Sequence, residues 1–314
     1  MEERTVTVII PTYKPDEKFR ELMNRLAKQT VRPEQIWIIN TEEAYFHPED
    51  TACVPNVSVI HIKKEEFDHG GTRDMAARMA DTELLVFMTM DAVPADGYLL
   101  EHLIRPFQNP QVAAAYARQL PGKDGNILET YTRNFNYGPE SCIKTKEDLD
   151  RLGIKTFFCS NVCAAYRRST YLELGGFEKH TIFNEDMIFA GKLIQAGKAI
   201  AYCKDARVYH SHNYSGIQQF RRNFDLGVSQ ADHPEIFGMA KSETEGIRMV
   251  KQTAARLAGT GRLLTLWRFL WQSGCKWMGY RLGKGYRRLP RGIIMRCTMN
   301  PSYWRQKLPE QAEK

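Results

Sequence analysis

The chain lacks several features that would each assign it to a class of proteins. No apolar run approaches the ~20 residues that a membrane-spanning helix requires, and the opening MEERTVTVII does not resemble a secretion signal. The seven cysteines contain no CxxC pair, so we expect buried, reduced thiols in place of a zinc ribbon or a disulfide framework. Together these absences predict a cytoplasmic protein.

Acidic residues are missing from one long segment. Between Arg248 and Lys307 there are 14 of the 44 Lys and Arg residues and no Asp or Glu, which leaves 30 basic against 37 acidic residues elsewhere. Four of the five tryptophans also lie in this segment: Trp267, Trp271, Trp277 and Trp304. We therefore expect a mildly acidic domain over residues 1–240 and a basic, Trp-rich helical region over residues 241–314.

Hydrophobic segments alternate with amphipathic ones along the first domain. The pattern predicts strands at 6–11, 35–40, 57–62, 84–90, 112–116, 159–166, 199–201 and 207–209. It predicts helices at 16–29, at 75–80 and from a cap at Asn184 to 196. This order is typical of an α/β fold with a mostly parallel, Rossmann-like sheet that has helices on both faces.

The loop after the first strand, PTYKPDE, contains no glycine. A dinucleotide-binding domain would show GxGxxG here, so hydride transfer is not the expected reaction. Pro11, Thr12 and Tyr13 offer a rigid turn, a hydroxyl and a ring that can pack on a base, although an ordinary turn fits equally well. Asn40 ends the second strand and can hydrogen-bond a base or a ribose.

Three further segments carry charged residues where a ligand could bind. In HGGTRD (69–74), two glycines at a helix start can expose backbone N–H groups to an anion, which a plain structural helix start would also explain. The strand LLVFMTM delivers a lone carboxylate, Asp91, to its C-terminal end. Asn184-Glu185-Asp186 opens a helix whose N-terminal dipole favours ionised carboxylates.

In this order, the segments resemble the nucleotide-sugar glycosyltransferases of family 2, which have the GT-A fold. FDHGGTRD, YARQLP, NFNYGP, FFCSNVCAAYRRS and FRRNFDLG further resemble the rhamnosyltransferase branch of bacterial polysaccharide synthesis. The resemblance extends over residues 5–304. It implies that Thr89-x-Asp91 stands in the place of a DxD metal motif, and that His210, at the end of RVYH, completes a Mg²⁺ or Mn²⁺ site with Asp91. His212 is the second candidate.

The resemblance also implies the remaining roles. Asp186 is the expected general base, and the acceptor side is expected to comprise Arg118, Gln119, Ser160, Asn161 and Glu185. The donor is expected to be held by Pro11, Thr12, Tyr13, Asn40, His69, Gly70, Gly71, Arg73, Asp74 and Asp91.

The implied activity is inverting, metal-dependent transfer of L-rhamnose from dTDP-rhamnose to a lipid-linked saccharide, at the inner face of the cell membrane. A transferase of UDP-sugars, a nucleotidylyltransferase and a non-catalytic binder built on a degenerate domain are alternatives. In the tail, one helical face gathers Leu263, Leu264, Leu266, Trp267, Leu270, Trp271, Trp277 and Met278. Such a basic helix fits an anionic membrane surface or packing against the first domain, and no nucleic-acid partner is expected.

Overall fold

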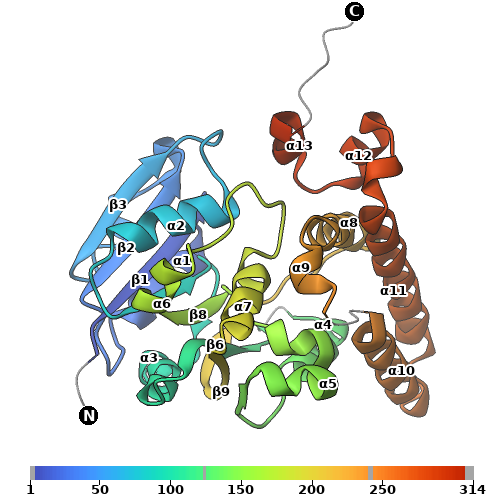
Figure 1. Ribbon diagram of the computed structural model, residues 1–314, viewed down its shortest axis with the longest axis horizontal. Coiled ribbons are helices and arrows are strands. Elements are labelled where there is room, and N and C mark those ends of the chain that lie inside the picture. The colour runs from blue at the N-terminus through green and yellow to red at the C-terminus, as the bar shows by residue number, and fades with distance from the viewer. Residues whose placement is uncertain (1–3, 123–124, 240–242, 308–314) are drawn as a thin grey trace, which may run out of the picture. The chain divides into compact units, whose positions relative to one another are not determined.

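The computed structural model describes residues 4–122, 125–239 and 243–307 (Figure 1). The chain divides into two compact units, one formed by Met1–Lys179 with Glu185–Ser211 and the other by His180–Asn184 with His212–Lys314. The division therefore comes at 211/212, earlier than the 240/241 boundary expected from composition. The physical reason is that α8 (Gly216–Asp232) packs along α11 (Leu263–Lys284) of the basic tail. A division by function at 240/241 stays a prediction.

The first unit is an α/β domain built on one mixed sheet. Its strands are β1 (Val6–Tyr13), β2 (Gln35–Thr41), β3 (Val57–Ile62), β4 (Leu84–Met88), β5 (Val93–Pro94), β6 (Val112–Leu120), β7 (Cys142–Lys144), β8 (Cys163–Arg167) and β9 (Ala199–Tyr209). Their order is β3-β2-β1-β4-β8-β6-β9-β5, and β7 pairs with β9. Since β6 and β4 are both antiparallel to β8, and β9 is parallel to β6, six of these strands run in one direction. The expected mostly parallel sheet is confirmed.

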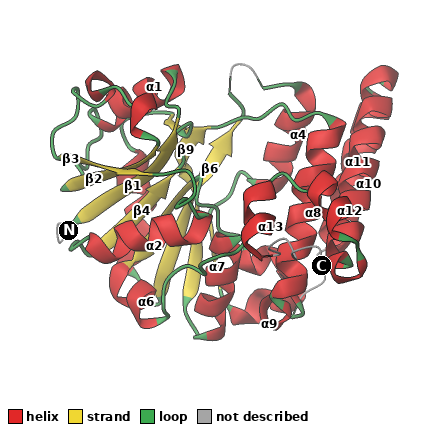
Figure 2. Ribbon diagram, turned by 90° about the horizontal axis from the view of Figure 1, so that it is seen from above, coloured by secondary structure: helices red, strands yellow, loops and turns green. Residues whose placement is uncertain are grey.

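Helices cover both faces of this sheet (Figure 2). The helices of this unit are α1 (Glu17–Leu26), α2 (His69–Met79), α3 (Leu99–Ile104), α4 (Ile127–Asn136), α5 (Leu149–Leu152), α6 (Arg168–Glu173) and α7 (Glu185–Gln195). Side chains alternate along each strand, so Val8 and Ile10 of β1 form one core with Phe19 of α1. Phe87 of β4 points to the other face, where its ring packs 5.0 Å from that of Phe177.

Some elements differ from their predicted bounds. β6 extends to Leu120 and so carries Arg118 and Gln119, and one strand, β9, replaces the two predicted at 199–201 and 207–209. The strand predicted at 159–166 begins only at Cys163, because the Cys163 amide closes a turn onto the Ser160 carbonyl. That turn leaves Ser160 and Asn161 outside the sheet.

The second unit is helical, as expected for the basic tail. It comprises α8, α9 (Pro234–Phe237), α10 (Glu243–Gly259), α11, α12 (Arg291–Cys297) and α13 (Pro301–Lys307). A Cβ atom added at Gly279 or Gly283 of α11 would overlap the carbonyl oxygen of Phe220 or Phe224 in α8. The two backbones therefore approach closely where α11 has no side chains. Trp304 is fully buried against Tyr286, with ring centroids 5.3 Å apart.

Candidate functional site

The C-terminal ends of the parallel strands meet at one edge of the sheet, which is where α/β sheets bind ligands. The predicted residues lie at these ends: Thr12 and Tyr13 on β1, Asn40 on β2, Asp91 after β4, Gln119 on β6, and His210 after β9. The sequence thus placed these groups at the same edge, and the structure shows which of them touch.

Thr12 and Asn40 form one contact at this edge. They are partners in the β1–β2 register, and the Thr12 hydroxyl donates to Asn40 Oδ1 at 3.1 Å. Asn40 Nδ2 donates to the Glu42 carbonyl at 3.1 Å and also faces His61 Nδ1 at 3.1 Å. Pro11 lies within the strand, opposite Ile39. The pair is buried and already hydrogen-bonded within the chain, and its contact with a nucleoside stays a prediction.

Tyr13 is exposed and belongs to a group of rings and lysines that the sequence did not indicate. Its ring meets that of Tyr45 edge-on with centroids 5.9 Å apart. The Lys14 ammonium lies 4.5 Å from the Tyr45 centroid, and the Lys64 ammonium lies 5.8 Å from that of Tyr13. These residues come from three separate segments, so no spacing in the sequence links them. Together they present aromatic surface and positive charge, which suit a base and phosphates.

Asp91 and His210 come together as the sequence suggested. Asp91 Oδ2 lies 3.5 Å from Nε2 of the buried His210. A carboxylate and an imidazole are suitable ligands for a divalent ion such as Mg²⁺ or Mn²⁺. Nearby in the sequence, the buried Thr89 Oγ1 has no hydrogen-bond partner among the residues described here. His212, the second candidate, belongs to the other compact unit.

Gln119 and Arg133 surround the other nitrogen of His210. Gln119 Oε1 is 3.1 Å from His210 Nδ1, and Arg133 Nη2 is 3.2 Å from it. Binding of a metal at Nε2 requires the neutral imidazole proton to be on Nδ1, where Gln119 Oε1 can accept it. In the other tautomer, Nδ1 accepts from Arg133 and Nε2 donates towards Asp91. The residues therefore fit a metal site whose histidine is oriented by Gln119.

Sequence reasoning missed Arg133. It lies on α4, donates to Gln119 Oε1, and is held by Glu129 at 2.7 Å. Its one signal was its place directly before NFNYGP, a motif that carried the family resemblance but no evident chemistry.

The first turn of α2 is tightly packed. The Asp68 carboxylate caps the helix by accepting from the Gly71 amide, and the helix begins at His69, so both glycines lie inside its first turn. A Cβ atom at Gly70 would overlap the Glu178 carbonyl oxygen. These contacts explain the Gly-Gly pair by close packing and capping, and its role in binding an anion stays a prediction.

Asp74 is fully buried, and its carboxylate binds other side chains of the same unit. Its carboxylate accepts from Arg78 Nε at 2.8 Å and from the Tyr171 hydroxyl at 3.2 Å. Lys179 Nζ is 3.6 Å away. The preceding residue, Arg73, is not among these partners. Arg73 instead donates to the His69 carbonyl at 2.8 Å and pairs with Glu185 at 3.3 Å.

Arg73, Glu185 and Asp186 form the electrostatic centre of the site. Burial opposes the ionisation of Glu185, but Arg73 and His69, together with hydrogen bonds from its own backbone amide and from Asn161, hold its pKa below the usual value. Burial, aided by the negative Glu185, raises the pKa of Asp186 to about 7. A carboxylate with a pKa near the working pH is well suited to accept a proton from a hydroxyl.

Asn161 connects this acidic pair to the Gln119 side of the site. Its backbone amide donates to Asp186 Oδ2 at 3.1 Å, and its Nδ2 donates to Glu185 Oε1 at 3.4 Å. The neighbouring Ser160 hydroxyl accepts from Gln119 Nε2 at 3.0 Å. Four of the residues expected on the acceptor side, Gln119, Ser160, Asn161 and Glu185, are thus linked. Arg118 is not part of this network. Burial raises the pKa of Tyr202, and the positive charge of Arg118 opposes that rise.

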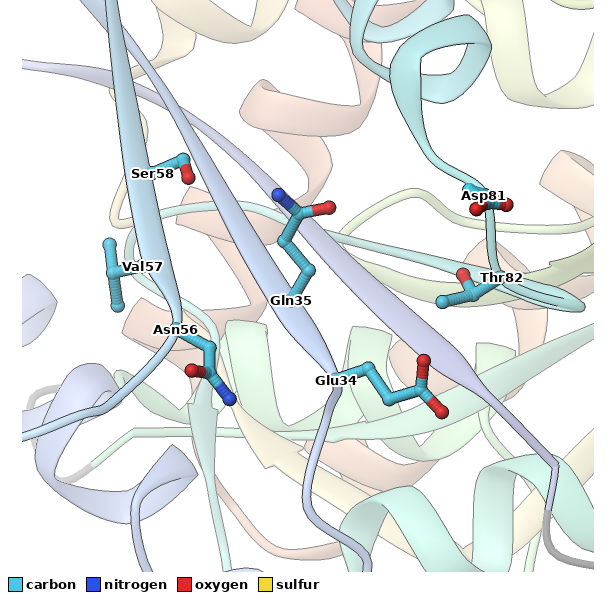
Figure 3. A pocket seen from close by; sticks show the side chains of 7 residues that line it. All are labelled: Glu34, Gln35, Asn56, Val57, Ser58, Asp81 and Thr82. Carbon is cyan, nitrogen blue, oxygen red and sulfur yellow. The ribbon is translucent and has the colours of Figure 1, made fainter.

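A pocket lies at the opposite edge of the sheet (Figure 3). Gln35 and Val57, which begin β2 and β3, line it together with Asp81 and Thr82, which precede β4. Since these are the N-terminal ends of the strands, the pocket is separate from the edge that carries Asp91 and His210.

Comparison with known proteins identifies the family to which the chain belongs. The family model Glycosyl transferase family 2 matches residues 7–175. The chain is 40% identical over 305 residues to the O-antigen chain rhamnosyltransferase RfbN of Salmonella typhimurium, which spans 95% of this chain and 96% of the relative. It is 42% identical over 308 residues to the O-antigen chain rhamnosyltransferase WbaN of Salmonella anatum, with 95% of each covered.

Solved structures share the fold at lower identity. The mannosyltransferase PcManGT from Pyrobaculum calidifontis, in complex with GDP-Man and Mn²⁺, has a TM-score of 0.60 at 16% identity and covers 91% of this chain and 87% of its own. The 1-349 portion of TarS from S. aureus, in complex with UDP-GlcNAc, has a TM-score of 0.53 at 15% identity and covers 90% and 92%. At these identities the likeness shows the fold alone.

Proposed function

Because this chain belongs to glycosyl transferase family 2 and is a glycosyltransferase, we propose that it transfers L-rhamnose from dTDP-rhamnose to a lipid-linked saccharide in surface-polysaccharide synthesis. The observation that carries the proposal is the identity of 40–42% over 95% of the chain to two relatives named as O-antigen chain rhamnosyltransferases. The lipid-linked acceptor would place the protein peripherally at the inner face of the membrane.

In the proposed site, Asp91 and His210 would hold Mg²⁺ or Mn²⁺, and Gln119 would keep the His210 tautomer that offers Nε2. When bound, the ion would supply positive charge against the diphosphate of the leaving nucleotide. Arg73 and the lysines beside Tyr13 and Tyr45 add cationic groups of the chain itself at the donor side. The contact of Thr12, Tyr13 and Asn40 with the nucleoside belongs to the same proposal.

Asp186 is the proposed base. It would take the proton of the acceptor hydroxyl while that oxygen attacks C1 of the sugar from the face opposite the departing nucleotide, so that the anomeric configuration inverts. The Asn161 and Met187 amides hold the two carboxylate oxygens at 3.1 and 2.7 Å, which fixes the carboxylate for this transfer. No nucleophile of the protein is required.

The test separates donor recognition from base catalysis. Binding of dTDP-rhamnose, UDP-glucose, UDP-galactose and GDP-mannose is measured with and without Mn²⁺, and Asp186→Asn is compared with Asp150→Asn, an exposed acid on α5. We expect metal-dependent binding of dTDP-rhamnose, and loss of transfer in Asp186→Asn with donor binding retained. Preference for a UDP-sugar would reject the rhamnosyl donor, and unchanged transfer in Asp186→Asn would reject the base.

A further inference from the structure

One side of α11 presents large apolar side chains to solvent. Leu264, Trp267 and Trp277 are 84%, 71% and 62% exposed. At 100° per residue they share one face with other exposed residues of this helix: Leu263, Leu270, Trp271 and Met278. We call these seven residues the α11 apolar face. Isolated exposed apolar residues are ordinary on a protein surface, but a contiguous group of this kind marks an interaction site.

The opposite side of α11 packs on α8, and it is the less hydrophobic side. Its buried positions are Phe269, Gly279 and Gly283, and both glycines lie against α8 backbone carbonyls. An amphipathic helix that packs on its own protein normally buries its apolar side. Here α11 instead packs on α8 through its glycines, which let the two backbones approach closely. The α11 apolar face is therefore left exposed by the way its own unit is built.

Basic residues accompany this face. On the same helical wheel Arg281 and Lys284 fall within or at the margin of the face, Arg268 flanks it, and all three are exposed. No acidic residue occurs anywhere between Arg248 and Lys307. The charge that this segment carries is thus of one sign, which complements an anionic partner.

We propose that the α11 apolar face docks the protein on the surface of a bilayer that contains anionic phospholipid. Tryptophan prefers the headgroup region, and leucines beside it can enter the acyl boundary while the basic residues meet lipid phosphates. Among the described residues, no helix is long and apolar enough to cross a membrane. The 22-residue α11, about 33 Å long, would lie in the plane of the surface.

A second copy of the chain fits this face less well. A symmetric dimer through α11 would bring the same basic segment of each copy together, with no acidic residue in the segment to pair with it. The lipid surface is therefore the better match on charge. The inference deepens the proposed function and rests on it for the lipid-linked acceptor, although docking itself requires no sugar.

Docking is tested with the full chain and vesicles in the absence of any sugar. The probes are vesicles of phosphatidylcholine alone and of phosphatidylcholine with phosphatidylglycerol, and sedimentation measures the bound fraction. The test variant combines Leu264→Ser, Trp267→Ser and Trp277→Ser. Its matched control replaces three other exposed residues by serine: Met79, Tyr98 and Ile217.

We expect binding to the anionic vesicles only, a loss of at least about tenfold in the test variant, and no loss in the control. Replacing Arg268, Arg281 and Lys284 by glutamine should weaken binding by about fivefold for each basic residue that lies near the surface. Circular dichroism and transfer to a soluble acceptor should match the wild type in every variant, which shows that the fold is retained.

Two results would overturn the inference. One is vesicle binding that the serine substitutions leave unchanged, and the other is a wild-type dimer that the test variant dissociates in the absence of vesicles. The proposed function fails separately: an enzyme that uses no dTDP-rhamnose but still binds anionic vesicles would refute the donor and keep the docking face.

Discussion

The raised pKa of Asp186 leads to a specific pH dependence. Burial and the neighbouring Glu185 raise this pKa to about 7, against the Asn161 and Met187 amides, which favour the ionised form. Only the ionised carboxylate can accept a proton. With a pKa of about 7, the ionised fraction is about 9% at pH 6 and about 91% at pH 8. Rate should therefore rise about tenfold across this range, whereas an ordinary aspartate would leave it flat.

The assay is the initial rate of transfer at low donor concentration between pH 5.5 and 8.5, at constant ionic strength and with saturating Mn²⁺. Glu185→Gln removes the charge that helps to raise the pKa of Asp186 and leaves Arg73 to act on Asp186 alone. Both changes lower that pKa, so the midpoint of the profile should move to lower pH. Glu178→Gln, which removes a partner of Lys192, is the control and should leave the midpoint in place.

A flat wild-type profile over this range would refute Asp186 as the base that limits transfer. An identical midpoint in Glu185→Gln and the wild type would refute the electrostatic argument, even if the profile itself is sloped.

Two further predictions concern the helical unit and the metal site. Gly283→Ala should lower the free energy of unfolding by about 1–3 kcal/mol, because the added Cβ would overlap a carbonyl oxygen of α8. Gly274→Ala, on the same helix with nothing within 4 Å of the added Cβ, should raise it by up to about 1 kcal/mol. Equal shifts of the melting temperature in the two variants would contradict the packing argument. Gln119→Leu should weaken Mn²⁺ binding, measured by calorimetry, by about 10–100-fold through loss of the His210 tautomer. Gln119→Glu should retain binding, the exposed Gln111→Leu should have no effect, and normal affinity in Gln119→Leu would reject the orienting role.

Much of the α/β unit could be predicted from the sequence because local patterns and chain order carry the information. Apolar runs of strand length and the alternation of strands with helices indicate a parallel sheet, and the last residues of its strands must then meet at one edge. This is why Thr12 lies close to Asn40, its partner on the adjacent strand. The pairing of Asp91 with His210 was expected from the family resemblance, because β4 and β9 are not adjacent in the sheet. The acidic pair at the start of α7 was likewise visible as a helix start.

The partners of several site residues could not be predicted. Asp74 follows Arg73 directly, yet its carboxylate meets Arg78 one turn along the helix and Tyr171, 97 residues away. Arg133 reaches His210 over a separation of 77 residues, and its place before NFNYGP, its one local signal, indicates no chemistry. Side-chain partners across such separations depend on how helices settle on the sheet, which local periodicity does not describe.

By itself, the sequence determined the order of the elements, the edge at which the site residues gather, and the separation of a basic helical tail, because these follow from periodicity, strand direction and composition. Only the tertiary structure decided which side of α11 is buried. Its hydrophobic pattern favours burial of the Leu and Trp side, but the contact with α8 is made through Gly279 and Gly283, where the backbones can approach. The physical reason is that packing depends on the shapes of two surfaces together, whereas a pattern along one helix describes only one of them.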